Sequence, residues 1–389
     1  MGVDFFPAVT TELLFTQRCN MACTYCFEPS KNKKKMTQQD MLDFVASIPS
    51  TGIMMFGGEP LLDLDLFTAL YDAIEAKQMN EAQKQTLLQS FTVQTTLITN
   101  GLLVRKYVDV LKKYNIGVQI SIDGPKELND LHRIHPDGTG TYDEIMDAIQ
   151  FCIDTGIRWG WHGAVGADGF PYMVDLFNFN WDLSKKLCTT NGILDVAKAI
   201  KMMGENNFQI IFEYEYTDKD IDVFLNAQGD VFSLTLTFED PDISLTMNNR
   251  IALLQSWFER QGSACVAGNT LLAVDSNMDV FACHRPAMTS RKDEHKLGNL
   301  KDRSTFTGFK LFNNYTELDR RKYMYAAIQP NDGYKKSAPQ QNWCPAANAE
   351  TSDTVFYQSA KYNLMIAEYG RFVKEIFEYA GIPHRVLTN

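Results

Sequence analysis

Three cysteines close together constrain this chain more than any other feature. Cys19, Cys23 and Cys26 follow an apolar, strand-like run over residues 8–15, and gaps of three and two residues separate them. This spacing lets one loop turn three thiolates toward a common centre, and such soft ligands suit an iron–sulfur cluster. Because only three cysteines are supplied, one iron of a four-iron cluster would stay open to bind a small molecule and pass it an electron.

Two alternative interpretations fit these cysteines less well. A structural zinc site usually pairs two C-x-x-C knuckles, and a disulfide loop is typical of secreted proteins. We expect no secretion signal ahead of Cys19, and no apolar run approaches the ~18 residues of a membrane span. The sequence therefore predicts a cytoplasmic protein whose eight cysteines are metal ligands or buried packing residues. Cys152, within a helical pattern, is assigned to packing.

Composition and charge exclude one class of partner. The 389-residue chain is 45% apolar, enough for a substantial core in two domains or one elaborated barrel, and its formal net charge is −11. No basic stripe interleaved with aromatic residues is present, so extended nucleic-acid binding is not expected. We interpret the one basic run as a solvated loop. It consists of Lys31, Lys33, Lys34 and Lys35.

Strand-like and helical segments alternate along most of the chain. Thr37 and Asp40 form a capping-box pattern that predicts the start of the first helix. Six such units in series predict an α/β protein with a partial (β/α)6 TIM barrel, whose chemistry gathers at the carboxyl ends of the strands. Residues 218–244 show no clear period and suggest a substrate-covering insertion. The predicted strands lie at residues 8–15, 52–56, 91–98, 118–123, 159–165 and 208–216.

A second module is predicted after residue 262. A helix over 247–260 precedes it, and short strand patterns at 271–275, 278–283 and 298–300 indicate a small hairpin module. The tail from 362 to 379 has the pattern of an amphipathic helix with an apolar docking stripe. This stripe consists of Leu364, Ala367, Phe372, Val373 and Ile376. The predicted division is therefore 1–262 for the barrel and 263–389 for the second module.

Four motifs follow one another along the chain. They are Cys19-x3-Cys23-x-Tyr25-Cys26, Gly57-Gly58-Glu59-Pro60, Ser121-Ile122-Asp123-Gly124-Pro125 and His132-Arg133. Taken together, they resemble the radical S-adenosylmethionine (SAM) superfamily, in its sulfatase-maturating and peptide-modifying branch. The resemblance implies a [4Fe–4S] cluster that binds SAM at its open iron and cleaves it to a 5′-deoxyadenosyl radical, which takes a hydrogen atom from the substrate. It also implies an external one-electron reductant of the flavodoxin or ferredoxin type.

The same resemblance implies roles for individual residues. The motif from Gly57 through Gly58 and Glu59 to Pro60 would meet the methionyl ammonium of SAM, with glycine permitting close backbone approach. The remaining expected cofactor contacts are at Tyr25, Asn100, Ser121, Asp123 and Arg133. Ser121 and Arg133 would hold its ribose or carboxylate, and a surface ion pair is the alternative for the arginine. A turn or cap role is the alternative for Asn100 and Asp123, and loop packing the alternative for Tyr25.

The C-terminal part resembles the SPASM/twitch extension in a shortened form. Cys265, Cys283 and Cys344 remain, and Met278 replaces a glycine usual in the turn before the second of them. The resemblance implies a small auxiliary domain with a single auxiliary [4Fe–4S] cluster, whose fourth ligand comes from elsewhere, from substrate or from nothing. Alternatively, the auxiliary cluster is lost and these three cysteines pack in the core.

His284 is the candidate catalytic residue. It follows Cys283 directly, where sulfatase-maturating relatives carry an acidic base, and it would accept a proton or hydrogen-bond to the cluster. His162 is expected to be a core or pocket histidine. The expected substrate is a peptide or protein side chain. The alternatives are a radical isomerase or modifying enzyme acting on a small molecule or nucleobase, and a non-catalytic iron–sulfur carrier or sensor.

Overall fold

The computed structural model divides the chain into two compact units. The first consists of Met1–Ile122, Asp130–Gly160 and Val266–Arg321, and the second of Asp123–Asn129, Trp161–Cys265 and Lys322–Asn389. The predicted boundary at residue 262 stays a prediction. The structure describes residues 9–26, 28, 34–48, 50–75, 80–81, 95–206, 208–210, 216–258, 271–281, 283–287, 292–305 and 360–382.

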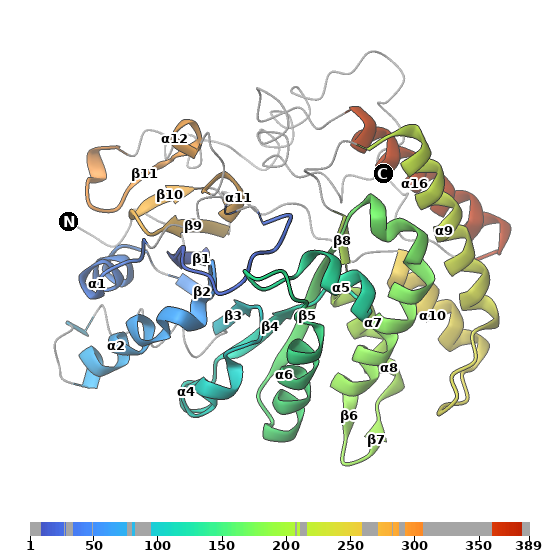
Figure 1. The fold of residues 1–389 in the computed structure, drawn as a ribbon, viewed down its shortest axis with the longest axis horizontal. Coiled ribbons are helices and arrows are strands. Elements are labelled where there is room, and N and C mark those ends of the chain that lie inside the picture. Colours follow the sequence, from blue (N-terminus) through green and yellow to red (C-terminus); the bar gives the residue numbers. More distant parts are fainter. Residues whose placement is uncertain are drawn as a thin grey trace. The chain divides into compact units, whose positions relative to one another are not determined.

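The first unit is built on a mainly parallel sheet (Figure 1). Its strand order is β11-β10-β9-β1-β2-β3-β4, in which β9, β1, β2, β3 and β4 run parallel and β9, β10 and β11 pair antiparallel. The strands are β1 (Val9–Thr16), β2 (Ser50–Gly57), β3 (Thr95–Thr99), β4 (Gly117–Ser121), β9 (Leu271–Asp275), β10 (Asp279–Phe281) and β11 (Gly298–Asn299). Because the carboxyl ends of β1 to β4 lie at one edge, the loops that follow them can meet there.

Helices follow these strands as the alternating pattern predicted, and Figure 1 shows α2, α4 and α6 along one side of the sheet. The capping box at the start of α1 is confirmed: the Thr37 hydroxyl accepts the Asp40 N–H, and the Asp40 carboxylate accepts the Thr37 N–H. Cys152 is fully buried in α6, so its assignment to packing is confirmed. The helices are α1 (Gln38–Ser47), α2 (Leu64–Glu75), α4 (Val108–Lys113), α5 (Lys126–His132) and α6 (Tyr142–Thr155).

The predicted hairpin module is part of this sheet. β9 pairs in parallel with β1, from Thr10 opposite Leu271 to Leu14 opposite Asp275. The short helix α11 (His284–Ala287) then packs its Ala287 with Leu14 in a small hydrophobic cluster. Two strands more than 250 residues apart in sequence therefore lie side by side.

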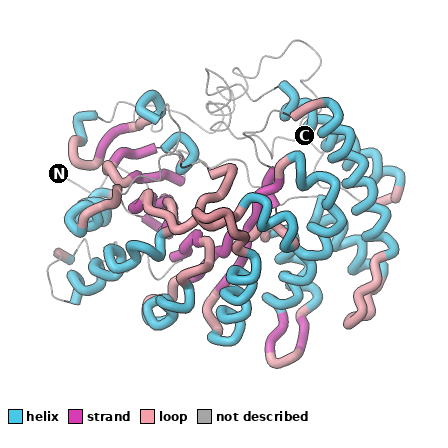
Figure 2. Tube along the Cα trace, viewed as in Figure 1, coloured by secondary structure: helices cyan, strands magenta, loops and turns pink. Residues whose placement is uncertain are grey.

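Helices dominate the second unit, as the cyan segments of Figure 2 show. β5 (Trp159–Val165) pairs in parallel with β8 (Phe208–Ile210), and β6 (Thr189–Thr190) with β7 (Ile193–Leu194) forms a small hairpin. The helices are α7 (Met173–Cys188), α8 (Val196–Glu205), α9 (Asp218–Thr237), α10 (Met247–Phe258) and α16 (Ala360–Tyr379).

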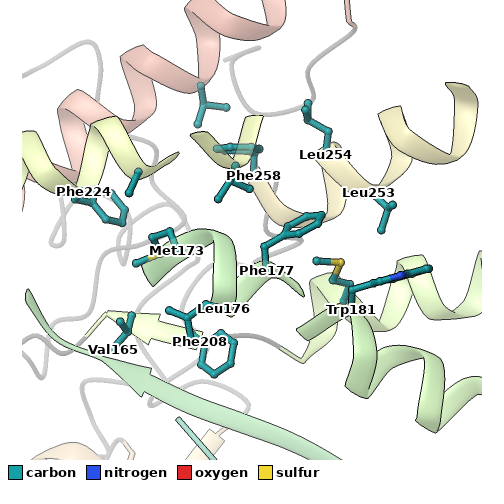
Figure 3. Close-up of a cluster of buried hydrophobic side chains, with 14 of the residues drawn as sticks. Val165, Met173, Leu176, Phe177, Trp181, Phe208, Phe224, Leu253, Leu254 and Phe258 are labelled. Atoms are coloured by element: carbon teal, nitrogen blue, oxygen red, sulfur yellow. The ribbon is translucent and has the colours of Figure 1, made fainter. Parts of the chain in front are cut away.

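The core of the second unit is an aromatic cluster (Figure 3). Phe177 of α7 meets the ring of Trp257 with a centroid distance of 5.3 Å, and Trp181 donates its Nε1–H to Asp240 at 2.7 Å. From the predicted stripe on α16, Val373 is buried, whereas Phe372 and Ile376 are half-buried against this core. The side chains of Leu364 and Ala367 lie outside the described residues.

Several predicted boundaries change. The segment 218–244, unassigned from sequence, contains the 20-residue helix α9, which starts with a Thr217–Asp220 capping box and buries Phe224 and Val231 in this core. β4 ends two residues before Asp123. Residues 91–94 and 211–215 of the predicted third and sixth strands lie outside the described residues. None of the helices that the structure describes has the length and apolarity needed to cross a membrane.

Candidate functional site

The cysteine loop leaves the carboxyl end of β1. Cys19, Cys23 and Cys26 are half-buried and carry unbridged thiols. A turn closes the loop through the Cys26 N–H, which donates to the Cys23 carbonyl at 3.2 Å. Phe27 lies outside the described residues. The loop is therefore a preformed element of the first unit, and its position depends on the segments that touch it.

The end of β2 approaches the entry of this loop closely. The N–H groups of Gly58 and Glu59 donate to the carbonyls of Thr16 and Arg18 at 2.9 and 2.7 Å. A Cβ atom at Gly57 would lie 2.1 Å from the Thr16 oxygen, and one at Gly58 would lie 2.2 Å from the Arg18 oxygen. Gly57 also has φ +142°, which side chains rarely adopt. Both glycines are thus required by backbone contact with the residues that lead into Cys19.

The Glu59 carboxylate joins this motif to the end of β3. It is buried and accepts the Leu61 N–H at 3.0 Å, the Thr99 hydroxyl at 2.8 Å and the Asn100 N–H at 2.8 Å. Burial raises the pKa of Glu59 to about 7, against the lowering effect of these hydrogen bonds. Pro60 begins the 3-10 turn Pro60–Asp63, where its fixed φ suits a first helical position.

Asn100 connects β3 to the cysteine loop. Its side-chain nitrogen donates to the Asn20 side-chain oxygen at 2.7 Å, and its own oxygen accepts the Leu102 N–H at 3.1 Å. The second bond is the turn role that the sequence offered as an alternative. Through the first hydrogen bond, Asn100 also holds Asn20, the residue that follows Cys19.

The segment after β4 holds the other side of the loop. Ala22 and Thr24 donate their N–H groups to the carbonyls of Ile134 and His132 at 2.8 and 3.0 Å. The Arg133 guanidinium lies 5.6 Å from the centre of the Tyr25 ring. Because Arg133 is buried, a surface ion pair does not describe it. The predicted Tyr25 and Arg133 are therefore brought together beside the cysteines.

A buried carboxylate that the sequence reading missed anchors the loop entry. Asp63 accepts hydrogen bonds from the Thr16 hydroxyl at 2.7 Å, from Arg18 at 2.7 Å and from Lys35 at 2.9 Å. Burial alone would raise its pKa, but these partners outweigh burial and hold the pKa of Asp63 below its usual range. The sequence signal that could have identified Asp63 was its position four residues after Glu59, at the end of the turn that Pro60 begins.

Ser121 and Asp123 fall in different units. Ser121 is buried at the end of β4 in the first unit. Asp123 belongs to the second unit, where its carboxylate accepts the Ala164 N–H at 2.9 Å and its own N–H donates to Asn129. A cofactor contact from either residue stays a prediction. His162 is half-buried on β5, also in the second unit.

Three cysteine thiols in one loop are a donor set that suits an iron–sulfur cluster. Burial raises the pKa of the Cys19 thiol to about 11, and the nearby Glu59, Cys23 and Cys26 add to this shift. A bound cationic centre would reverse it by stabilising the thiolates. Within the described ranges, no three Cys, His, Asp or Glu side chains converge on a position for one ion. A cluster does not need such convergence, because each cysteine binds a different iron.

The predicted catalytic histidine has a carboxylate partner. His284 Nδ1 lies 2.9 Å from Glu12 Oε1, and the His284 N–H donates to Glu12 Oε2 at 2.6 Å. Its ring stacks on Phe56 at 4.5 Å between centroids. Glu12 was missed by the sequence reading, although an acid inside the apolar pattern of β1 was a visible signal. Of the predicted auxiliary cysteines, Cys283 is buried, and Cys265 and Cys344 lie outside the described residues.

Comparison with known proteins identifies the domain. The model of the radical SAM superfamily matches residues 13–179. This part of the chain is a radical SAM domain. The cysteine-type anaerobic sulfatase-maturating enzyme of Clostridium perfringens is 23% identical, over 93% of each chain. The serine-type enzyme of Bacteroides thetaiotaomicron is 27% identical, over 41% of this chain and 40% of its own length.

A solved structure confirms the predicted fold. Native anSMEcpe with bound AdoMet and the Cp18Cys peptide aligns with a TM-score of 0.62 at 18% identity, covering 96% of this chain and 97% of that one. The predicted α/β fold is thereby confirmed. The match to the radical SAM superfamily implies a [4Fe–4S] cluster and SAM. The chain spans about half the length of several curated relatives, with 56% for an uncharacterized protein of Methanocaldococcus jannaschii.

Substitution of Gly58 tests whether the β2 contact places the cysteine loop. We expect Gly58→Ala to lose most of its iron after anaerobic reconstitution, because the new Cβ must displace the Arg18 carbonyl next to Cys19. Gly229→Ala is the matched control, since its Cβ would meet only Phe372 at 3.9 Å. Iron and sulfide per chain are the measurement. Full cluster content in Gly58→Ala would show that the loop does not depend on this contact.

Glu59 should make stability depend on pH. Its pKa rises from 4.5 to about 7 on folding, so the folded chain keeps a proton that the unfolded chain releases. The stability from this group is complete below about pH 4.5 and is lost as pH rises through about 7. Relative to Glu59→Gln, the free energy of unfolding of the metal-free protein should fall by about 3 kcal/mol across this window. Urea titrations of both proteins at several pH values measure this difference in stability. Parallel pH profiles for the wild type and Glu59→Gln would contradict the prediction.

Proposed function

We propose that this protein cleaves SAM reductively and uses the resulting radical to modify a peptide or protein side chain. One observation carries the proposal: segments at the ends of β2, β3 and α5 all hold the three-cysteine loop that follows β1. A loop fixed from three sides can present three thiolates to a cluster in one arrangement. When bound, the cluster and SAM would supply a 5′-deoxyadenosyl radical that removes a hydrogen atom from the substrate.

The residues around the loop would position SAM. Gly57, Gly58 and Glu59 are proposed to face its methionyl ammonium, and Ser121 and Arg133 its ribose or carboxylate. The burial of Arg133 beside Tyr25 supports this role, because a guanidinium shielded from water binds a carboxylate more strongly than an exposed one. Asn100 and Asp123 complete the proposed set.

The peptide substrate rests on the relatives. Two of them are sulfatase-maturating enzymes, and one solved neighbour holds a bound peptide. We propose a peptide or protein substrate on this basis, together with an external one-electron reductant and a cytoplasmic location.

His284 is proposed as the group that accepts a proton from the substrate. Glu12 supports this role, because a carboxylate bonded to Nδ1 fixes the ring and leaves Nε2 as the accepting atom. The Phe56 ring stacked on the imidazole restricts its rotation further. A single auxiliary cluster on Cys265, Cys283 and Cys344 belongs to the same proposal.

The first test measures SAM cleavage. Reconstituted and reduced with dithionite, the wild type should form 5′-deoxyadenosine, and Cys23→Ala should form less than about 1% of that amount because it lacks a cluster ligand. Cys188→Ala is the matched control, since Cys188 is a buried cysteine of α7, which belongs to the second unit. A wild type that keeps its cluster but does not cleave SAM would refute the enzyme and favour an electron carrier.

The second test counts irons. One cluster on the first cysteine set and one on the auxiliary set predict about eight irons per chain, falling to about four in Cys283→Ala. Iron and sulfide analysis with Mössbauer spectra would measure both values. About four irons in the wild type, unchanged in Cys283→Ala, would remove the auxiliary cluster from the proposal and leave Cys283 as a packing residue.

A further inference from the structure

In the first unit, cationic side chains lie over buried carboxylates. Arg18 and Lys35 bind the same oxygen of Asp63 at 2.7 and 2.9 Å. The Asp63 side chain is 1% exposed, whereas the Arg18 and Lys35 side chains are 39% and 41% exposed. The negative charge is therefore covered and the positive charges face water.

Three further ion pairs repeat this arrangement. The aspartate side chains in them are 6–9% exposed and the lysine side chains 28–56% exposed. A further lysine, Lys34, contacts the amide oxygen of Asn277. The pairs are Lys301 with Asp40 at 2.6 Å, Lys292 with Asp275 at 3.2 Å and Lys296 with Asp279 at 3.3 Å.

Contacts join the segments that carry these cations. The segment carrying Lys34 and Lys35 runs antiparallel to the end of β1, with Thr16 bridged to Lys35 and the Gln17 N–H donating to the Lys34 carbonyl at 2.9 Å. Lys34 also reaches Asn277 in the β9–β10 turn, between Asp275 and Asp279. Figure 1 shows α1, β9, β10, β11 and α12 (Lys292–His295) in the same part of the first unit. The lysine rim consists of Arg18, Lys34, Lys35, Lys292, Lys296 and Lys301.

We propose that the lysine rim is the docking surface for an acidic one-electron carrier protein. This rests on the proposed function, in which each SAM cleavage consumes one electron that the carrier loses and the cluster gains. Arg18 is covalently next to Cys19, so a partner on the rim lies against the residues that lead into the cluster loop. A chain of net charge −11 repels an acidic protein as a whole, and an outward positive rim selects the approach that brings the redox centres together.

A flavodoxin, an acidic flavin protein, is the probe. Lys34→Gln, Lys296→Gln and Lys301→Gln are combined in one variant, because each amide can still donate a hydrogen bond to its partner. The control combines Lys186→Gln, Lys198→Gln and Lys219→Gln, three exposed lysines of the second unit, and changes the net charge equally. The reconstituted holoenzymes are titrated with flavodoxin to obtain Kd, and cluster reduction by reduced flavodoxin is followed by stopped-flow absorbance.

We expect the rim variant to bind flavodoxin roughly tenfold more weakly at low salt, with a matching loss in the second-order reduction rate. The difference should shrink as salt shortens the Debye length to about 8 Å at 0.15 M and below. Lys34→Gln alone, which keeps the ion pairs with Asp63, Asp40, Asp275 and Asp279, should change Kd in the same direction by a smaller factor. Unchanged Kd and rate in the rim variant, or equal losses in rim and control variants, would overturn the proposal and make an acidic substrate segment the next occupant to test.

SAM cleavage driven by dithionite separates this inference from the proposed function. Dithionite needs no protein docking, so the rim variant should form 5′-deoxyadenosine at the wild-type rate. Loss of cleavage with dithionite in the wild type refutes the proposed function itself. Wild-type cleavage with an unchanged flavodoxin Kd in the rim variant refutes the docking surface alone.

Discussion

The backbone contact between the end of β2 and the residues entering the cysteine loop is the constraint on which the rest of the site depends. Two N–H groups meet two carbonyls there, at a separation that only glycine permits at positions 57 and 58. Every other contact of the loop acts on a segment already fixed at its entry. Glu59 adds the end of β3 to this contact, so one motif sets the positions of three strand ends.

Charge around the loop is arranged in layers. Asp63 and Glu59 are buried beneath it, and their partners include backbone N–H groups, hydroxyls and two cations that face outward. These donors lower the cost of burying each carboxylate; for Asp63 they outweigh burial, and for Glu59 they offset it only in part. The same donors rigidify the loop entry, which a cluster with one open iron requires if its thiolates are to keep their places during electron transfer.

Local sequence patterns predicted most of the fold and of the cysteine site. Contacts between residues far apart in the sequence account for what these patterns missed. The cysteine spacing, the glycine pair and the strand-helix alternation are short-range signals, and the structure bears out the parallel sheet. β9 beside β1 joins residues more than 250 positions apart, and so does Glu12 beside His284. No periodicity reports such contacts. The helix α9 is a different case, because its Thr217–Asp220 capping box was present in the sequence while Gly229 and two threonines obscured the apolar period.

The engaged donors of the glycine motif restrict how it would meet SAM. The N–H groups of Gly58 and Glu59 already donate to Thr16 and Arg18, and three donors occupy the Glu59 carboxylate. A motif whose N–H groups are engaged in this way would offer a ligand mainly acceptor atoms, which repel carboxylates. A protonated amine matches that surface and a carboxylate does not. The proposed division follows, with the ammonium of SAM at the glycine motif and its carboxylate at a cationic group such as Arg133.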